Sequence, residues 1–226
     1  MSKDLLVTMY CTNPKHLFDQ YMQQLKTAGI DIYVERVTSF PNENSGGTAA
    51  WKVESFRRRA LMFRDYEKIV YTCAWDMLFY GTKAEVMAKI PDDGVILGAE
   101  RNCYPDADLA PKFKGDTPWR FVNGGPMAGS PQAILDWLDA FEHHPLYRPQ
   151  EIDQRILNWM RAEDSPLTPL DDCTELFYCL AAEQGDLDFE RGLPVNKLCG
   201  THPNFLHFNG RSPVEPVMEL YERSLR

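Results

Sequence analysis

Long apolar runs are missing from this 226-residue sequence. No stretch approaches the ~20 consecutive apolar residues that a membrane-spanning helix needs. The first four residues, Met-Ser-Lys-Asp, also lack the basic region and apolar core of a secretory signal. We therefore expect a cytoplasmic protein without a membrane partner.

Paired cysteine motifs are absent as well. The six cysteines lie at positions 11, 73, 103, 173, 179 and 199, and none forms a Cys-x-x-Cys pair. This spacing argues against a zinc knuckle. Without a secretory signal, the cysteines are expected to be reduced, buried thiols rather than disulfides.

Positive charge is scarce, and the formal net charge is −9. This balance argues against a protein that grips nucleic acid over a wide surface, because phosphate contacts need clustered lysine and arginine. Nucleic acid is therefore considered only as an acceptor that the protein would modify. Most of the basic residues on one predicted helix are expected to form a solvated face: Lys52, Arg57, Arg58, Arg59 and Arg64.

Three widespread catalytic signatures are missing too. The sequence has no phosphate-binding Walker loop, no Gly-x-Gly-x-x-Gly after a strand and no Gly-x-Ser-x-Gly elbow. Hydrophobic content of 44% and charged content of 25% are ordinary for a globular protein. We expect one domain over residues 1–226, with residues 212–226 as a helix packed on it.

Strands and helices are predicted to alternate through the first hundred residues. Expected strands are 5–10, 30–37, 68–73 and 95–99, and expected helices are 14–28, 48–65 and 82–90. This order predicts an α/β fold. Further along, helices are expected at 130–141 and 152–162, strands at 174–181 and 205–208, and loops at 101–119 and 184–204.

Polar residues follow three of the predicted strands. Asn13 follows the first, Asp76 the third and Glu100 the fourth. Because ligands bind beyond the carboxyl ends of strands in open parallel sheets, these residues are the expected walls of one site.

Five short motifs then occur in a fixed order. They are residues 69–76 ending in Asp76, residues 98–106, residues 120–129, residues 151–154, and the tetrapeptide His207-Phe208-Asn209-Gly210. In this order they resemble the glycosyltransferase domain of the procollagen lysyl hydroxylases and collagen galactosyltransferases, over roughly residues 5–210. The resemblance implies a GT-A like three-layer α/β sandwich around a central, mainly parallel mixed sheet.

The resemblance also implies a cation and a nucleotide-sugar donor, with UDP as the expected nucleotide. Mn²⁺ or Mg²⁺ would neutralise the diphosphate leaving group, and Asp76 and His207 would be its ligands. One position departs from the family, because Cys73 stands where its first metal-binding aspartate is expected. A thiol is a poor ligand for a hard cation. The metal is then weakly held, replaced by a base such as Lys52, or absent.

Further roles follow from the same resemblance. Asp153 is expected to orient the donor sugar or activate the acceptor hydroxyl, with Asn123 and Glu151 beside the reacting groups. The expected contacts to the donor are Lys52, Glu100, Tyr104, Gly124, Asn209 and Gly210. Taken alone, several of these residues are equally typical of turns, helix starts or core packing.

The predicted function is therefore metal-assisted transfer of a sugar from a nucleotide-diphosphate donor to a hydroxyl acceptor. The acceptor stays open between a saccharide, a small metabolite, a protein and a hydroxylated nucleobase of modified DNA. A different class of function also stays open. The fold could serve as a catalytically inactive module that binds nucleotides or nucleotide sugars, with Cys73 marking the loss of catalysis.

Overall fold

A five-stranded mixed sheet forms the centre of the computed structural model, which describes residues 3–11, 17–37, 48–181 and 185–226. Its strand order is β2-β1-β3-β6-β5. β1 runs parallel to β2 and β3, whereas β6 runs antiparallel to both β3 and β5, so four of the five strands share one direction. The strands are β1 (Lys3–Cys11), β2 (Asp31–Arg36), β3 (Tyr66–Cys73), β5 (Val95–Glu100) and β6 (Phe121–Gly129).

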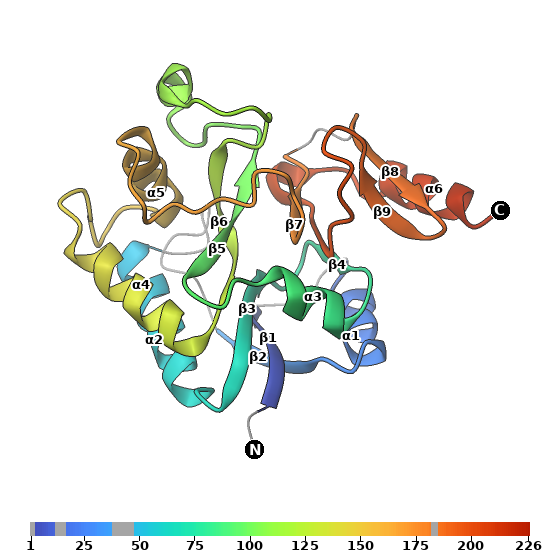
Figure 1. Cartoon of the computed structure of the whole chain (residues 1–226), viewed down its shortest axis with the longest axis horizontal. Helices are drawn as coiled ribbons and strands as arrows, with labels where there is room; N and C mark the ends of the chain where they lie inside the picture. Colours follow the sequence, from blue (N-terminus) through green and yellow to red (C-terminus); the bar gives the residue numbers. More distant parts are fainter. Residues whose placement is uncertain (1–2, 12–16, 38–47, 182–184) are drawn as a thin grey trace.

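Helices lie on both sides of this sheet (Figure 1). One face is covered by α2 (Ala49–Met62), α4 (Pro131–His143) and α5 (Asp153–Ala162). The other face is covered by α1 (Phe18–Thr27), α3 (Lys83–Lys89) and a second sheet. Leu6 packs on the first side, whereas Leu5 and Val7 pack on the second, which explains why β1 is apolar at consecutive positions. The predicted three-layer α/β sandwich with a mainly parallel mixed sheet is confirmed.

The second sheet has the order β4-β10-β7 and comes from distant parts of the chain. Its strands are β4 (Met77–Phe79), β10 (Phe205–His207) and β7 (Phe177–Cys179). Phe79, Phe177 and Phe205 face the central sheet, while the residues that alternate with them face outward. The hairpin of β8 (Leu187–Glu190) and β9 (Leu193–Asn196), together with α6 (Glu215–Ser224), covers that outward face.

Two of the predicted helices begin with caps that their sequences explain. Thr82 and Glu85 form the reciprocal capping box that starts α3. Ser130 caps α4, with Pro131 at its first position. The start of the helix predicted at 14–28 lies outside the described residues.

Other predictions are wrong. Residues 184–204 were expected to form a loop, but 187–190 and 193–196 pair as an antiparallel hairpin. The apolar residues of that hairpin, Leu187 and Phe189, alternate with polar ones because only one of its faces is buried. Residues 121–129 form a full strand, although Gly124 and Gly125 in its centre are typical of a turn. Short 3₁₀ helices at Ala107–Lys112 and Asn209–Arg211 complete the elements.

The basic residues in and after α2 are only partly solvated, since Arg58 and Arg64 are exposed and Lys52, Arg57 and Arg59 are not. Arg57 pairs with Asp139 and Glu142 of α4, and Arg58 pairs with Glu35. Arg59 is buried, with its guanidinium group 4.2 Å from the ring centroid of Tyr10. The positive charge of this helix is therefore largely used in packing.

Within the described segments, no helix is long and apolar enough to cross a membrane. The five cysteines whose side chains are described are free thiols, as predicted, but only Cys103 and Cys179 are buried, whereas Cys73, Cys173 and Cys199 are partly exposed.

Candidate active site

A cavity of about 710 Å³ opens beyond the carboxyl ends of β1, β3 and β5. This is the edge of the sheet at which an open α/β fold binds its ligands. Ten of the eleven candidate site residues line it: Lys52, Asp76, Glu100, Tyr104, Asn123, Gly124, Asp153, His207, Asn209 and Gly210.

Glu151 is the candidate that lies elsewhere. Its carboxylate accepts a hydrogen bond from the backbone N–H of Ile152 at 2.9 Å and pairs with Arg155 at 2.9 Å. It therefore acts at the start of α5 rather than lining the cavity. Asn13 lies outside the described residues.

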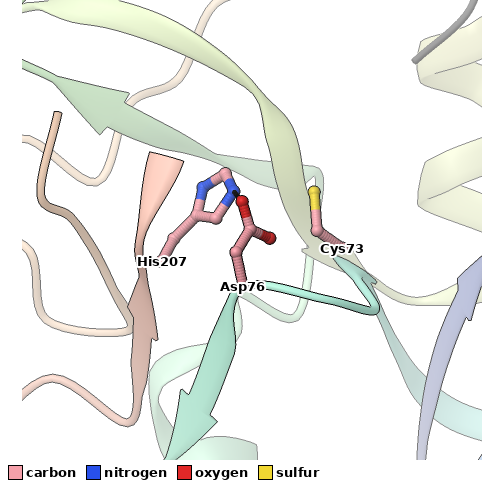
Figure 2. A group of neighbouring side chains, drawn as sticks. All are labelled: Cys73, Asp76 and His207. Carbon is pink, nitrogen blue, oxygen red and sulfur yellow. Dashed lines mark ion pairs between the residues drawn. The ribbon is translucent and has the colours of Figure 1, made fainter. Parts of the chain in front are cut away.

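Cys73, Asp76 and His207 all line the cavity and lie next to one another, and we call them the cation cluster (Figure 2). Cys73 ends β3, and Asp76 lies in the turn between β3 and β4. His207 ends β10 and is paired in register with Met77, the residue after Asp76. The backbone N–H of Phe208 also donates to the carbonyl of Asp76 at 2.8 Å. The second sheet, rather than the central one, therefore joins these two residues.

The cation cluster is compact. His207 Nε2 lies 3.4 Å from Asp76 Oδ2, and one ligand atom from each of the three residues lies within 4.8 Å of the others. On its far side, His207 Nδ1 contacts the buried thiol of Cys179 at 3.7 Å. Sulfur, carboxylate oxygen and imidazole nitrogen are all metal-ligating atoms.

Charges in the cation cluster stabilise one another. Burial disfavours the charged imidazolium, but the nearby carboxylate of Asp76 outweighs it and holds the pKa of His207 well above its usual value. Burial acts against the carboxylate too, yet the charge of His207 keeps the pKa of Asp76 below its usual value. The second carboxylate oxygen, Asp76 Oδ1, is buried and has no hydrogen-bond partner among the described residues. An orphaned carboxylate oxygen beside an imidazole and a thiol fits a divalent cation.

Glu100 is the centre of a second group, which we call the glutamate cluster: Glu100, Asn123, Gln154 and Asn209. Glu100 lies at the end of β5 and is only 3% exposed. Its Oε2 accepts hydrogen bonds from the amides of Asn123, at 2.9 Å, and Asn209. Its Oε1 accepts one from the amide of Gln154. Burial raises the pKa of Glu100 to about 6, although the three amide donors oppose that rise.

The side-chain amides of the glutamate cluster also accept hydrogen bonds through their oxygen atoms. Asn123 Oδ1 accepts from the N–H of Gly125 at 2.9 Å, and Gln154 Oε1 accepts from the N–H of Gly124 at 3.2 Å. Asn209 Oδ1 accepts from the N–H of Ala181 at 2.9 Å. The glutamate cluster therefore ties β5, β6, α5 and the segment after β10 into one rigid wall.

Lys52 and the buried Asp153 form an ion pair at another part of the cavity. Lys52 Nζ lies 2.6 Å from Asp153 Oδ2 and also donates to the carbonyl of Gly124 at 2.8 Å. Asp153 is the first residue of α5, where the helix dipole favours a carboxylate. The predicted donor-binding lysine and the predicted catalytic aspartate therefore contact each other.

Two glycines of β6 allow the walls to approach each other. A Cβ atom at Gly125 would lie 2.7 Å from His207 Cε1 and 3.3 Å from Cys73 Sγ. A Cβ atom at Gly124 would lie 2.7 Å from Asp153 Oδ2. The two separations of 2.7 Å are too short for real contacts, so the absence of side chains at these glycines lets His207 and Asp153 lie against the strand.

Tyr104 is an exposed aromatic residue in the cavity lining, with 49% of its surface accessible. An exposed aromatic ring at the rim of a cavity can stack on a planar ligand group.

Some lining or contacting residues were missed by sequence reasoning. Gln154 belongs to one of the five motifs, but only the structure shows its amide bound to Glu100. Cys179 had no signal beyond an apolar neighbourhood, and its contact with His207 depends on the pairing of β7 with β10.

Comparisons with known proteins bear on this site. A family model described as the PLOD GT domain matches residues 1–215. The uncharacterized protein R699 of Acanthamoeba polyphaga mimivirus is 25% identical to this chain over 164 residues. The alignment spans 70% of this chain and 34% of that protein, so the chain covers about a third of its relative.

A solved structure shares the fold over nearly the whole chain. It is described as a glycosyltransferase involved in the glycosylation of the major capsid of PBCV-1. The match has a TM-score of 0.52 and 10% sequence identity, and it covers 97% of this chain and 98% of that one.

Proposed function

The chain belongs to the PLOD GT domain family, and we propose on this premise that it transfers a sugar from a UDP-linked donor to a hydroxyl acceptor. The observation that supports the proposal is the cavity of about 710 Å³, which has both the cation cluster and the Lys52–Asp153 pair in its lining. Its volume lies within the usual range of small-molecule sites, about 300–1,000 Å³.

The cation cluster would face the diphosphate of the donor. A divalent cation held by Asp76 and His207 would act as a Lewis acid on the charge that develops there. Asp76 Oδ1, which lacks a partner among the described residues, is the oxygen available for this contact. His207 is held in place by β10 and by the contact of its Nδ1 with Cys179.

Lys52 would contact the diphosphate, and Asp153 would act nearer the sugar. The ammonium group of Lys52 is shared between Asp153 and the carbonyl of Gly124, so it can contact a phosphate oxygen without moving far. Asp153 would orient the sugar or take the proton of the acceptor hydroxyl as a general base. Asn123 and Asn209, held by Glu100, would form a fixed wall beside the donor, and Tyr104 would offer a stacking surface.

The acceptor is proposed only by class, as a hydroxyl group on a saccharide, a small metabolite, a protein or a hydroxylated nucleobase. Donor binding and donor hydrolysis can be measured without knowing it, because water can replace the acceptor. The first experiment is a thermal-shift screen of nucleotide sugars, since a ligand that binds the folded state raises its melting temperature. A UDP-sugar is expected to give the largest shift.

The second experiment measures donor hydrolysis by wild type and by Asp153→Asn. We expect the variant to bind the donor but to lose about 10²–10⁴-fold in kcat, as for loss of a general base. Asp19→Asn is the matched control, because Asp19 is also a first-turn acid, at an exposed position of α1 outside the cavity lining. Donor binding with no turnover in wild type would instead favour the inactive binding module. If no nucleotide sugar binds, the proposal fails.

A further inference from the structure

We propose that the cation cluster binds a divalent cation of the zinc or cobalt type, with Cys73 as a thiolate ligand, in preference to Mn²⁺ or Mg²⁺. The proposal deepens the proposed function, on which it rests for placing the metal beside the donor. The set of donor atoms is its basis, because Cys73, Asp76 and His207 present sulfur, oxygen and nitrogen to one point.

The chemistry of these atoms separates the two classes of cation. Mg²⁺, and to a large extent Mn²⁺, favour carboxylate, carbonyl and water oxygens, and a thiolate suits them poorly. Zn²⁺ binds thiolate, imidazole and carboxylate together. The cysteine that weakens this site for a hard cation is therefore a strong ligand for a softer one.

The distances in the cluster fit such a site. In a tetrahedral zinc site, ligand atoms at about 2.0–2.3 Å from the metal lie roughly 3.3–3.6 Å from one another. The distance from His207 Nε2 to Asp76 Oδ2 is 3.4 Å, and every pair of ligand atoms lies within 4.8 Å. A shift of about 1 Å by the half-buried Cys73 side chain would close the site.

The surroundings leave one position open. Zinc sites with three protein ligands keep a fourth position for water or substrate. All three residues line the cavity, so that position would face the bound ligand. Gly125 leaves the space that lets Cys73 and His207 converge, because a side chain there would contact both.

Cobalt is the probe that detects the thiolate directly. The full chain is stripped of metal with a chelator, and Co²⁺ is titrated in without any nucleotide. We expect a thiolate-to-cobalt charge-transfer band in the near ultraviolet, saturating at one Co²⁺ per chain. Cys73→Asp should remove the band, whereas Cys199→Ser, which changes a cysteine outside the cavity lining, should keep it.

Affinity ratios then test the preference. Most sites with nitrogen, oxygen and sulfur ligands favour Zn²⁺ over Mn²⁺, so the ratio of the two dissociation constants is compared between variants. Calorimetric titration should show that Cys73→Asp lowers the Zn²⁺ preference by at least about tenfold, while Cys199→Ser leaves it unchanged. Far-ultraviolet circular dichroism checks that each variant is folded.

Three results would overturn the inference: no charge-transfer band in wild type, the same ratio in wild type and Cys73→Asp, or tighter binding of Mn²⁺ than of Zn²⁺ by wild type. These outcomes are separate from those of the proposed function. A chain that binds Co²⁺ through Cys73 but binds no nucleotide sugar would support the metal assignment and defeat the transferase proposal. A chain that turns over donor with Mn²⁺ and shows no thiolate band would do the reverse.

Discussion

The two clusters in the cavity differ in how their polar atoms are used. In the glutamate cluster, both oxygens of Glu100 accept hydrogen bonds and each of the three amides is bound at both ends. In the cation cluster, one oxygen of Asp76 is buried without a partner among the described residues, and the ligand atoms are up to 4.8 Å apart. The polar atoms of the glutamate cluster are satisfied without a ligand, whereas those of the cation cluster would be satisfied by a bound cation.

The largest expected effect comes from removing the carboxylate of Glu100 at the centre of the glutamate cluster. Glu100→Ala removes the acceptor of three amide groups, of which that of Asn123 is buried and those of Gln154 and Asn209 are half-buried. Because each unsatisfied buried group costs about 1–3 kcal/mol, we expect the free energy of unfolding to fall by about 4 kcal/mol. Urea unfolding measures this change. Glu67→Ala, at an exposed position of β3, is the control. A loss below about 1 kcal/mol would show that the glutamate cluster is not a structural unit.

The two glycines of β6 offer a way to disturb each part of the cavity separately. Gly125→Ala presses on His207 and Cys73, whereas Gly124→Ala presses on Asp153. We expect each to cost about 2–3 kcal/mol of stability, as overpacking does. Urea unfolding measures this cost.

The functional effects of the two glycine variants should diverge. Metal affinity should fall in Gly125→Ala, and donor turnover at saturating metal should fall in Gly124→Ala. Gly185→Ala is the control, since a Cβ there meets nothing within 4 Å. Equal effects of Gly124→Ala and Gly125→Ala on metal affinity would mean that the two parts of the cavity are not independent.

The presence of two distinct clusters in the cavity was only partly predictable from the sequence. Asp76 and His207, far apart in the chain, were expected together because a familiar order of motifs placed them so, and the structure brings them to 3.4 Å. They meet through the pairing of β10 with β4 in the second sheet, and no motif in the sequence pointed to that sheet. Three-residue strands such as β4 and β10 have too few positions to show an alternating pattern.

The strand β6 was not predicted from the sequence, for a different reason. Glycine is depleted in strands, so Gly124 and Gly125 favour a turn in a local interpretation. Their place in a strand is explained by Asp153 and His207, which come from later segments and occupy the space where side chains would stand. The Lys52–Asp153 pair was missed likewise, because both residues were assigned to the ligand rather than to each other. Local propensity does not encode such contacts between distant segments.

A pH titration sharpens the comparison within the glutamate cluster. The pKa of Glu100 is raised from 4.5 to about 6, so the folded state binds the proton more tightly than the unfolded state. The stability from this group is therefore fully present below about pH 4.5 and is lost as the pH rises through about 6. Glu100→Gln has no such titration. The stability of wild type relative to this variant should fall by about 2 kcal/mol between about pH 4 and about pH 7.

Urea unfolding of both proteins across this range measures the difference, in which titrations common to both cancel. Asp171, which has a raised pKa of about 6 as well, is one such common group. A difference that grows with pH would mean that the three amide donors, rather than burial, decide the pKa of Glu100.

The smallest expected effect lies at Cys73. In metal-free protein, Cys73→Ala should change the free energy of unfolding by about 0.5 kcal/mol, because the side chain is half-buried and makes no hydrogen bond with the described residues. Cys179→Ala should cost more, about 1–2 kcal/mol, since that thiol is fully buried and contacts His207 Nδ1. Adding Zn²⁺ at 100 times its dissociation constant should stabilise wild type by about 2.7 kcal/mol, and Cys73→Ala much less. Cys73 would then contribute little to the stability of the fold and much to metal affinity. Glu100, in contrast, would stabilise the glutamate cluster whether a ligand is bound or not. A cost above about 2 kcal/mol for Cys73→Ala in the absence of metal would give Cys73 a packing role and remove that contrast.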